Sequence, residues 1–529
     1  MQGKKSIPIR EREKFIFYNT KGSDAKGSHT KGIDTQGSDF SPTCRDSQGS
    51  GKSHTLLCDT ESVAGSVSQR ACVYCGARVV LNPITDAYHI VHGPIGCASY
   101  TWDIRGSLSS GSETYRNSFS TDLHEKDVIF GGEKKLAGAI EEIVAQYAPK
   151  LIFVYSTCIV GVIGDDVEAV CRLAEAKHGI RVIPVKSPGF AGHKSMGYKA
   201  ACEALLTLFG KEKRQKVYGV NILGDFNLAG EMWILTGYLQ QMGIPVLARI
   251  TGDSSYAQLL RAPEACLNLV QCAGSMTYLA KRMKELYSTP FLKVSFYGLE
   301  DTKQSLLALA EALSDEEARD KALVLIEKEE KRIQEELDFY RRKLKGKKAA
   351  IYVGGGFKAI SLIKQFRDLG METVLVGTQT GKPEDYAVLR ELTEEGTVIL
   401  DDTNPYELEM FIREQGADIL VGGVKERPLA YKLGVAFCDH NHERRHPLAG
   451  FEGAVNFARE VYESIFSPVW SLVAAERTAY MDIENNTEKA NGHYNHGRRH
   501  PIVAFKGARD YAREMKEIEA RVEEGGGGL

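Results

Sequence analysis

The chain has 529 residues, enough for about three ordinary domains of roughly 150 residues each. Hydrophobic residues make up 43% and charged residues 26%, as is usual in a globular protein. A formal charge of −3 gives no electrostatic reason to expect nucleic acid or an anionic membrane as a partner. No stretch reads as an export signal or a membrane span, so we expect a cytoplasmic protein.

Eleven cysteines are spread irregularly along the sequence. An odd count without an export signal indicates reduced thiols rather than a disulfide framework. Some of them are then expected to pack in the core, and others to bind metal.

Residues 1–69 are expected to form a disordered leader, because they repeat Gly with Ser, Asp or His and contain few large apolar side chains. The run QGSGKS at 48–53 suggests a phosphate-binding loop, but Asp46 stands where that motif needs Gly. No predicted strand precedes the run either, so we do not assign a nucleotide site.

From Arg70 onward, buried strands alternate with amphipathic helices. The first helix is predicted from apolar residues on one helical face, namely Leu136, Ile140, Ile143 and Tyr147. Residues 151–158 then read as a buried parallel strand. The cycle recurs in two further blocks, which predicts an α/β fold of three doubly wound, Rossmann-like domains with parallel sheets. Their expected bounds are 70–215, 216–345 and 346–470.

Two other features help to divide the chain. A charged helix before the third block is predicted to start at a capping box formed by Ser314 and Glu317. The C-terminal tail, 471–529, contains a copy of residues 441–460 at 495–514, with twelve of twenty positions identical. A local duplication explains the repeat, and its role stays open.

Three cysteines share a setting at loops or strand ends, namely Cys72, Cys97 and Cys158. Cys97 follows Gly-Pro-Ile-Gly, a segment that we expect to be too turn-rich for a helix. Thiolates at such places could meet at one iron–sulfur cluster, which usually takes four cysteines. The fourth ligand would then come from another chain.

Other interpretations of the thiols remain open. Cys72 and Cys75 form a CxxC motif that could serve zinc or redox chemistry, although no second CxxC completes a zinc site. We expect the cysteines in apolar or helix-like runs to be packing residues, namely Cys171, Cys202 and Cys266. Cys44 and Cys58 fall in the leader, and Cys438 has no assigned role.

A second group of candidate ligands lies further along the chain. Cys272 ends a predicted strand, and Asn441 and His442 follow another near the end of the third block. Thiolate and imidazole together suit iron. His442 could equally be a surface histidine in the polar run HNHERRH.

The sequence from about Arg70 to Trp470 resembles the nitrogenase component-1 family. The stretches that carry the resemblance occur in the family's order: HGPIGC, TDLHEKDVIFGGEKKL, GDDVEAVC, VNILGDFNLAGE, SFYG, IYVGGG, GGVKE and FEGAVNFARE. The resemblance implies three Rossmann-like domains, with metalloclusters bound between domains and at a subunit interface. It also implies that Cys72, Cys97 and Cys158 hold an interface [4Fe-4S] cluster, that Cys272 binds the terminal iron of a larger cofactor, and that Lys425 lies near homocitrate.

Departures from the family pattern indicate which member this chain is most like. Lys194 and Tyr198 replace the Gln and His that flank Ser-Leu-Gly in the catalytic α subunit, and neither is a proton donor near neutral pH. Phe357 stands where an arginine is expected, and Asn441 or His442 replaces the molybdenum-binding histidine. The pattern resembles the α-type subunit of the scaffold that assembles the iron–molybdenum cofactor.

That resemblance implies an α2β2 complex with a β-type scaffold subunit. An iron–sulfur precursor would bind Cys272 and receive molybdenum and homocitrate, with the nitrogenase iron protein and a precursor-delivering protein as further partners. Lys194, Lys425 and Arg105 would surround the anionic precursor, or else be ordinary surface charges. Two other classes remain: a reductase, either the catalytic α subunit or a tetrapyrrole-reducing relative, and a purely structural partner of another metalloprotein.

Overall fold

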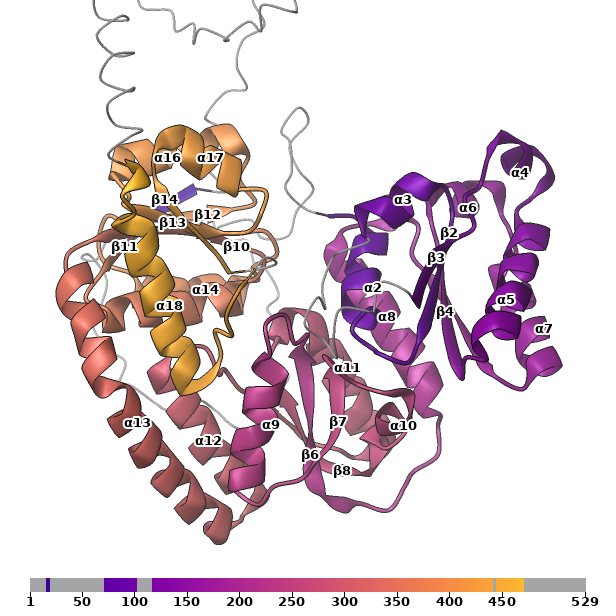
Figure 1. Ribbon diagram of the computed structural model, residues 1–529, viewed down its shortest axis with the longest axis horizontal. Coiled ribbons are helices and arrows are strands. Elements are labelled where there is room, and N and C mark those ends of the chain that lie inside the picture. Colours follow the sequence, from indigo (N-terminus) through magenta and orange to yellow (C-terminus); the bar gives the residue numbers. More distant parts are fainter. Residues whose placement is uncertain (1–15, 20–70, 102–116, 441–443, 471–529) are drawn as a thin grey trace, which may run out of the picture. The chain divides into compact units, whose positions relative to one another are not determined.

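The computed structural model describes residues 16–19, 71–101, 117–440 and 444–470. The chain divides into two units, Met1–Ser467 and Pro468–Leu529. Among the described residues, three separate β-sheets lie in the first unit (Figure 1). Their strands are parallel apart from one edge strand, and helices connect them, so the predicted α/β class is confirmed. The division into three domains stays a prediction.

The first sheet has the strand order β3-β2-β4-β5 and is parallel throughout. Its strands are β2 (Tyr88–His92), β3 (Ser118–Ser120), β4 (Leu151–Ser156) and β5 (Arg181–Lys186). Its helices are α2 (Val73–Leu81), α3 (Ile95–Tyr100), α4 (Glu125–Phe130), α5 (Glu133–Tyr147), α6 (Cys158–Ile163), α7 (Val167–His178), η2 (Gly189–Ala191) and α8 (Lys194–Phe209).

Strand β4 shows why both faces of the first sheet are covered. Phe153 and Tyr155 pack into a core cluster with residues of α2 and α8, whereas Ile152 and Val154 pack with residues of α5 and α7 on the opposite face. Side chains alternate across a strand, so a strand buried on both faces must be apolar throughout. The first of these clusters continues into the second sheet through Leu223, Val270 and Met276.

The second sheet has the order β7-β6-β8-β9 and is also parallel. Its strands are β6 (Val217–Asp225), β7 (Val246–Thr251), β8 (Ala265–Val270) and β9 (Phe291–Lys293). Its helices are α9 (Glu231–Gln241), α10 (Tyr256–Leu259), η3 (Ala262–Glu264), α11 (Ala273–Tyr287), α12 (Leu299–Leu313) and the long α13 (Glu316–Leu344).

The third sheet has the order β1-β12-β11-β10-β13-β14. Its strands are β1 (Ile16–Tyr18), β10 (Lys348–Val353), β11 (Glu372–Thr378), β12 (Val398–Asp401), β13 (Ile419–Gly422) and β14 (Ala436–Asp439). Its helices are α14 (Gly356–Asp368), α15 (Pro383–Leu392), α16 (Pro405–Gln415), α17 (Arg427–Leu433) and α18 (Gly450–Ile465). Helix α18 packs along α13, as Figure 1 shows.

Strand β1 lies inside the segment that the sequence predicted to be disordered. Its residues Ile16–Tyr18 pair antiparallel with β12. The Asn19 side chain donates hydrogen bonds to the carbonyl oxygens of Arg390 and Thr393. Three consecutive large apolar residues suffice to add an edge strand. The prediction missed this strand because it was based on the composition of the whole leader.

Three local predictions were wrong. Cys97 lies in a helix, α3, because Pro94 takes the N-cap place, where its missing N–H costs no hydrogen bond. Helix α13 is capped by Asp315, which accepts a hydrogen bond from the Ala318 N–H, while Ser314 ends α12 in a left-handed conformation. Tyr147 is 45% exposed rather than buried with its predicted partners on α5.

The strand orders decide where ligands can bind. In each sheet the central strand, β2, β6 or β10, has parallel neighbours on both sides, and crossovers leaving it in opposite directions open a crevice at the carboxyl ends of the strands. None of the described helices is both long and apolar enough to cross a membrane.

Candidate metal centres

The three cysteines predicted to bind an iron–sulfur cluster lie near the switch point of the first sheet. Cys97 follows β2 on α3, and Cys158 follows β4 as the first residue of α6. Cys72 is the N-cap of α2 and forms an isolated antiparallel bridge with His193. Adjacent strands β2 and β4 therefore bring together residues that are far apart in the sequence.

Gly189 shows how close two of these thiols are. Its N–H donates a hydrogen bond to the Cys158 Sγ at 3.1 Å. A Cβ built on Gly189 would lie 2.9 Å from the Cys158 Sγ and 3.5 Å from the Cys72 Sγ, so both sulfurs approach one backbone position. Burial raises the pKa of the Cys97 thiol, and the neighbouring Cys158 and Cys72 raise it further. The structure thus brings the three predicted cysteines together.

The geometry suits a multi-iron cluster better than a single ion. Within the described residues, no three His, Cys, Asp or Glu side chains are close enough to share one metal ion. A cluster needs no such closeness, since each thiolate binds a different iron atom. Cys72 and Cys97 are half-buried and Cys158 is exposed, so all three can reach a group bound at the surface.

Exposed apolar side chains surround these thiols. They belong to α3, α6 and η2, the elements that carry or contact the cysteines: Ile95, Tyr100, Val162 and Phe190. A cluster of large apolar residues on a surface marks an interaction site. The thiols therefore lie where another protein surface could cover them.

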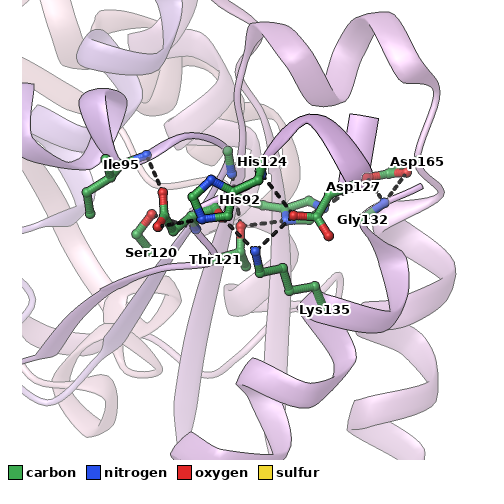
Figure 2. A network of polar contacts seen from close by, with 11 residues as sticks. His92, Ile95, Ser120, Thr121, His124, Asp127, Gly132, Lys135 and Asp165 are labelled. Carbon is green, nitrogen blue, oxygen red and sulfur yellow. Dashed lines mark hydrogen bonds and ion pairs between the residues drawn. The ribbon is translucent and has the colours of Figure 1, made fainter. Parts of the chain in front are cut away.

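A polar network fixes the segment that follows β3 (Figure 2). The buried His92 ring contacts the Thr121 hydroxyl at 3.0 Å and the Asp165 carboxylate at 3.1 Å. Asp165 also accepts hydrogen bonds from the Gly132 N–H, which precedes α5. Lys135 donates to the Asp127 carboxylate at 2.8 Å. Burial lowers the pKa of His92 despite the opposing effect of Asp165, so the ring is neutral at pH 7.

The segment held by this network carries helix α4. All but one of its residues are exposed, and two large apolar side chains at its end, Ile129 and Phe130, are 72% and 85% exposed. Large apolar side chains exposed on a hydrogen-bonded segment make this end of α4 a candidate interaction surface.

The second candidate site lies at the switch point of the second sheet. Cys272 is the N-cap of α11, two residues after β8 ends. A Cβ built on Gly224, near the end of β6, would lie 2.7 Å from the Cys272 Cβ. Strand β6 therefore passes directly against Cys272 through a glycine with a φ of +88°.

A buried cluster of charges follows on from Gly224. Asp225 ends β6, and Glu231 begins α9 with its carboxylate 3.1 Å from the Arg444 guanidinium. The side chains of Glu231 and Arg444 are 1% and 2% exposed. Lys358, on α14, donates to the His440 carbonyl oxygen at 3.0 Å and lies 5.6 Å from the Tyr297 ring centre. Two carboxylates thus meet two cations beside the strand ends.

Burial changes the ionisation of this cluster. Desolvation and, to a lesser extent, the Glu231 carboxylate raise the pKa of Asp225 to about 7, against the opposing effects of Arg444 and Lys358. Burial lowers the pKa of His440 well below its usual value, and the two neighbouring cations add to the effect. Neither ring nitrogen of His440 has a hydrogen-bond partner among the described residues, and its lowered pKa makes the imidazole neutral at pH 7.

Other predicted site residues are less closely placed. Lys425 is exposed in the β13–α17 connection, at the switch point of the third sheet. Lys194 is the first residue of α8, and its backbone lies against α2. Helix α8 also contacts α11, through the Cys202 thiol and the Ser275 carbonyl oxygen. Three predicted residues lie outside the described part of the chain, namely Arg105, Asn441 and His442.

The remaining cysteines divide as follows. Cys171 and Cys202 are buried in core clusters, as predicted. Cys266 is half-buried on β8. Cys438 is buried on β14 and hydrogen bonded to the Glu460 side chain. Cys75 is buried on α2, one turn beyond Cys72.

The sequence did not single out the residues of the charged cluster. They are Asp225, Glu231, Tyr297, Lys358, His440 and Arg444. Asp225, Glu231 and Tyr297 occur within stretches that carried the family resemblance, GDFNLAGE and SFYG. His440 and Arg444 fall in the polar run HNHERRH, and Lys358 follows the stretch IYVGGG.

Comparison with known proteins is consistent with this geometry. Residues 72–466 match the family described as nitrogenase component 1 type oxidoreductase. A protein of Clostridium pasteurianum named nitrogenase iron-molybdenum cofactor biosynthesis protein NifE is 66% identical over 89% of this chain and 98% of its own length. A protein of Methanosarcina barkeri with the same name is 56% identical over 80% of this chain and 95% of its own length.

A solved structure gives the same result for the fold. The structure titled "Nitrogenase Cp1 at pH 5" aligns with a TM-score of 0.77 and 30% identity, over 89% of this chain and 97% of the other. Sequence and structure comparisons agree across nearly the whole described region, and this chain belongs to the nitrogenase component 1 family.

Proposed function

We propose that this chain is the α-type subunit of a scaffold on which the iron–molybdenum cofactor of nitrogenase is assembled. The relatives that match it over most of their length bear the name of a cofactor biosynthesis protein. The observation that carries the proposal is that Cys272 lies just after the end of β8, while Lys194 and Tyr198 stand where the family resemblance expects Gln and His.

Lys194 and Tyr198 occupy those two positions. The Lys194 Nζ lies 6.0 Å from the centre of the Tyr198 ring, so the two side chains stack as cation and aromatic ring. Their ordinary pKa values lie near 10, far from the neutral range in which a general acid works. They can hold an anionic precursor without protonating a substrate, which suits storage rather than catalysis.

Within the site, the chain's own residues would bind and orient the cargo. The iron–sulfur precursor is a substrate here, held by the Cys272 thiolate at the N-terminus of α11, where the helix dipole favours an anion. Lys194, Lys425 and Arg105 would neutralise the precursor and homocitrate, with Asn441 or His442 as a labile second contact. Molybdenum and homocitrate would be inserted there and the product handed on.

The buried charged cluster would support that labile contact. His440 and Arg444 flank residues 441–443 on either side, and both side chains are buried. Arg444 is held by Glu231 of α9. The described residues on either side of 441–443 are thus held by contacts with α14 and α9.

The first site would hold a [4Fe-4S] cluster through Cys72, Cys97 and Cys158, with one thiolate from a β-type, NifN-like subunit. The apolar side chains around these thiols would be covered by that subunit in an α2β2 complex. The exposed end of α4 would dock the nitrogenase iron protein, and a further protein would deliver the precursor. The cluster itself supplies electron-transfer chemistry when bound.

The proposal is tested by asking whether the precursor iron and the interface-cluster iron can be lost separately. A Cys272→Ala variant, co-purified anaerobically with its β-type partner, should lose the precursor iron and keep the interface cluster. A Cys158→Ala variant should show the reverse. Cys266→Ala serves as the control, because that thiol is half-buried on β8, outside both sites. Equal loss of all iron in both site variants would contradict two independent sites.

A further inference from the structure

A second thiol lies at the N-terminal end of α2. Cys72 is the N-cap residue of this helix, and Cys75 is its third helical residue. The two residues are three positions apart on the first turn, so their side chains lie on the same side of this helix end. Cys72 is half-buried, whereas Cys75 is 2% exposed. The pair therefore presents one accessible and one sheltered sulfur at the same helix end.

Helix α3 links Cys75 to the other thiols. Cys97 and Tyr100 are three residues apart on α3 and so lie on one face of it. Tyr100 is hydrogen bonded to the Cys75 side chain. Burial, together with smaller effects of the neighbouring Cys75 and Cys72, raises the pKa of Tyr100 to about 12. Tyr74 likewise lies close enough to Cys97 and Cys75 for both thiols to raise its pKa.

The described part of the chain thus places four thiols around one region. Cys158 and Cys72 approach Gly189, Cys97 lies beside both, and Cys75 contacts Tyr100 on the helix that carries Cys97. The other core cysteines, Cys171 and Cys202, belong to clusters formed with α7 and α11. Cys75 is consequently the described cysteine placed to complete the set.

We propose that Cys75 is a fourth thiolate ligand, which lets this chain hold a four-iron cluster by itself before the β-type subunit binds. The inference rests on the interface cluster of the proposed function. It adds an earlier state, in which this chain carries the cluster before the two subunits assemble. Two cysteines in a C-x2-C spacing commonly bind one iron–sulfur cluster. Four thiolates from one chain meet the usual ligand number without a partner.

The surroundings favour an anionic cluster at this place. The first turn of α2 leaves backbone N–H groups without helical partners and carries the positive end of the helix dipole. Each thiol loses its proton as it binds iron, and the proton passes to the ligand that the thiolate displaces or to solvent. When the partner arrives, its thiolate would displace Cys75, which takes a proton back while keeping its contact with Tyr100.

The cluster-loading step can be tested with the purified full-length chain alone. Under anaerobic, reducing conditions, a synthetic [4Fe-4S] cluster with four small-thiolate ligands is offered. Each protein thiol displaces one small ligand, which leaves as free thiol, so no oxidant or reductant is consumed. The wild-type chain should take up one cluster and give the paramagnetic resonance spectrum of a four-iron cluster after reduction.

The Cys75→Ser variant should bind a cluster with one unsupported iron. Mild anaerobic oxidation with ferricyanide should then release that iron and leave a three-iron cluster, seen by its own resonance spectrum, whereas the wild-type cluster persists. Cys171→Ser is the matched control, because Cys171 is equally buried on a helix, and it should behave as the wild type. A folded three-iron product cannot arise from simple unfolding.

Two results would overturn the inference. One is a wild-type chain that takes up no cluster alone although the complex with its partner contains one, which would leave the proposed function intact. The other is a Cys75→Ser chain whose cluster resists ferricyanide as well as the wild type. Loss of the cluster from both the chain and the complex would instead contradict the proposed function.

Discussion

The buried pair of Glu231 and Arg444 offers the sharpest test of how the second site is supported. Their charged groups are 3.1 Å apart and almost fully buried. Glu231 also accepts hydrogen bonds from the N–H groups of Ala229 and Leu448, at 2.8 and 3.3 Å. Removing one partner of a buried ion pair leaves the other charge uncompensated, which costs about 3–5 kcal/mol. Glu231→Gln should therefore lower the free energy of unfolding by about that amount.

Urea denaturation of the metal-free chain, followed anaerobically, measures this change. The matched control is Glu336→Gln, which breaks an exposed pair with Arg459 at 2.7 Å and should change stability by at most about 1 kcal/mol. The double variant Glu231→Gln/Arg444→Met should recover part of the loss, since it removes the stranded charge. A loss below about 1 kcal/mol for Glu231→Gln would refute the idea that this pair fastens the segment bearing residues 441–443.

Further predictions concern pH and the thiol site. Burial raises the pKa of Glu426 to about 7, above its unfolded value near 4.5, so the native state loses stability as the pH rises from about 4.5 to 7. Over that window the wild type should lose about 3 kcal/mol relative to Glu426→Gln, and equal pH profiles in urea unfolding would contradict this. Gly189→Ala should reduce cluster iron, because its Cβ would lie 2.9 Å from the Cys158 Sγ. Gly237→Ala on α9, where an added Cβ would have no atom of the described residues within 4 Å, should leave cluster iron unchanged. Equal iron in the two variants would contradict the predicted clash with Cys158.

Much of the fold could be predicted because it depends on local patterns. Apolar runs such as residues 151–156 predict strands buried on both faces, and the carboxyl ends of parallel strands are where ligands bind. Cys158 and Cys272, each within two residues of such an end, could therefore be selected from the sequence. Exact helix ends could not, since Ser314 and Asp315 are both good caps and only the backbone conformation decides between them.

The parts that escaped prediction depend on contacts between distant residues. Gly189 is 31 positions from Cys158, yet its backbone N–H contacts that sulfur. Arg444 stands in the polar run HNHERRH, which reads as solvent-exposed, but its side chain is buried against Glu231, more than two hundred positions earlier. A charged residue is buried only where its partner is supplied, and one sequence does not say which residues become neighbours.

The proposed scaffold function is tested most directly by purifying this chain anaerobically with the proposed β-type partner and measuring iron, molybdenum and acetylene reduction on one sample. The account predicts more iron than one four-iron cluster per αβ pair and no acetylene reduction, because the proposed site has Lys194 and Tyr198 in place of a proton donor suited to neutral pH. Robust acetylene reduction would contradict it and identify the protein as a reductase.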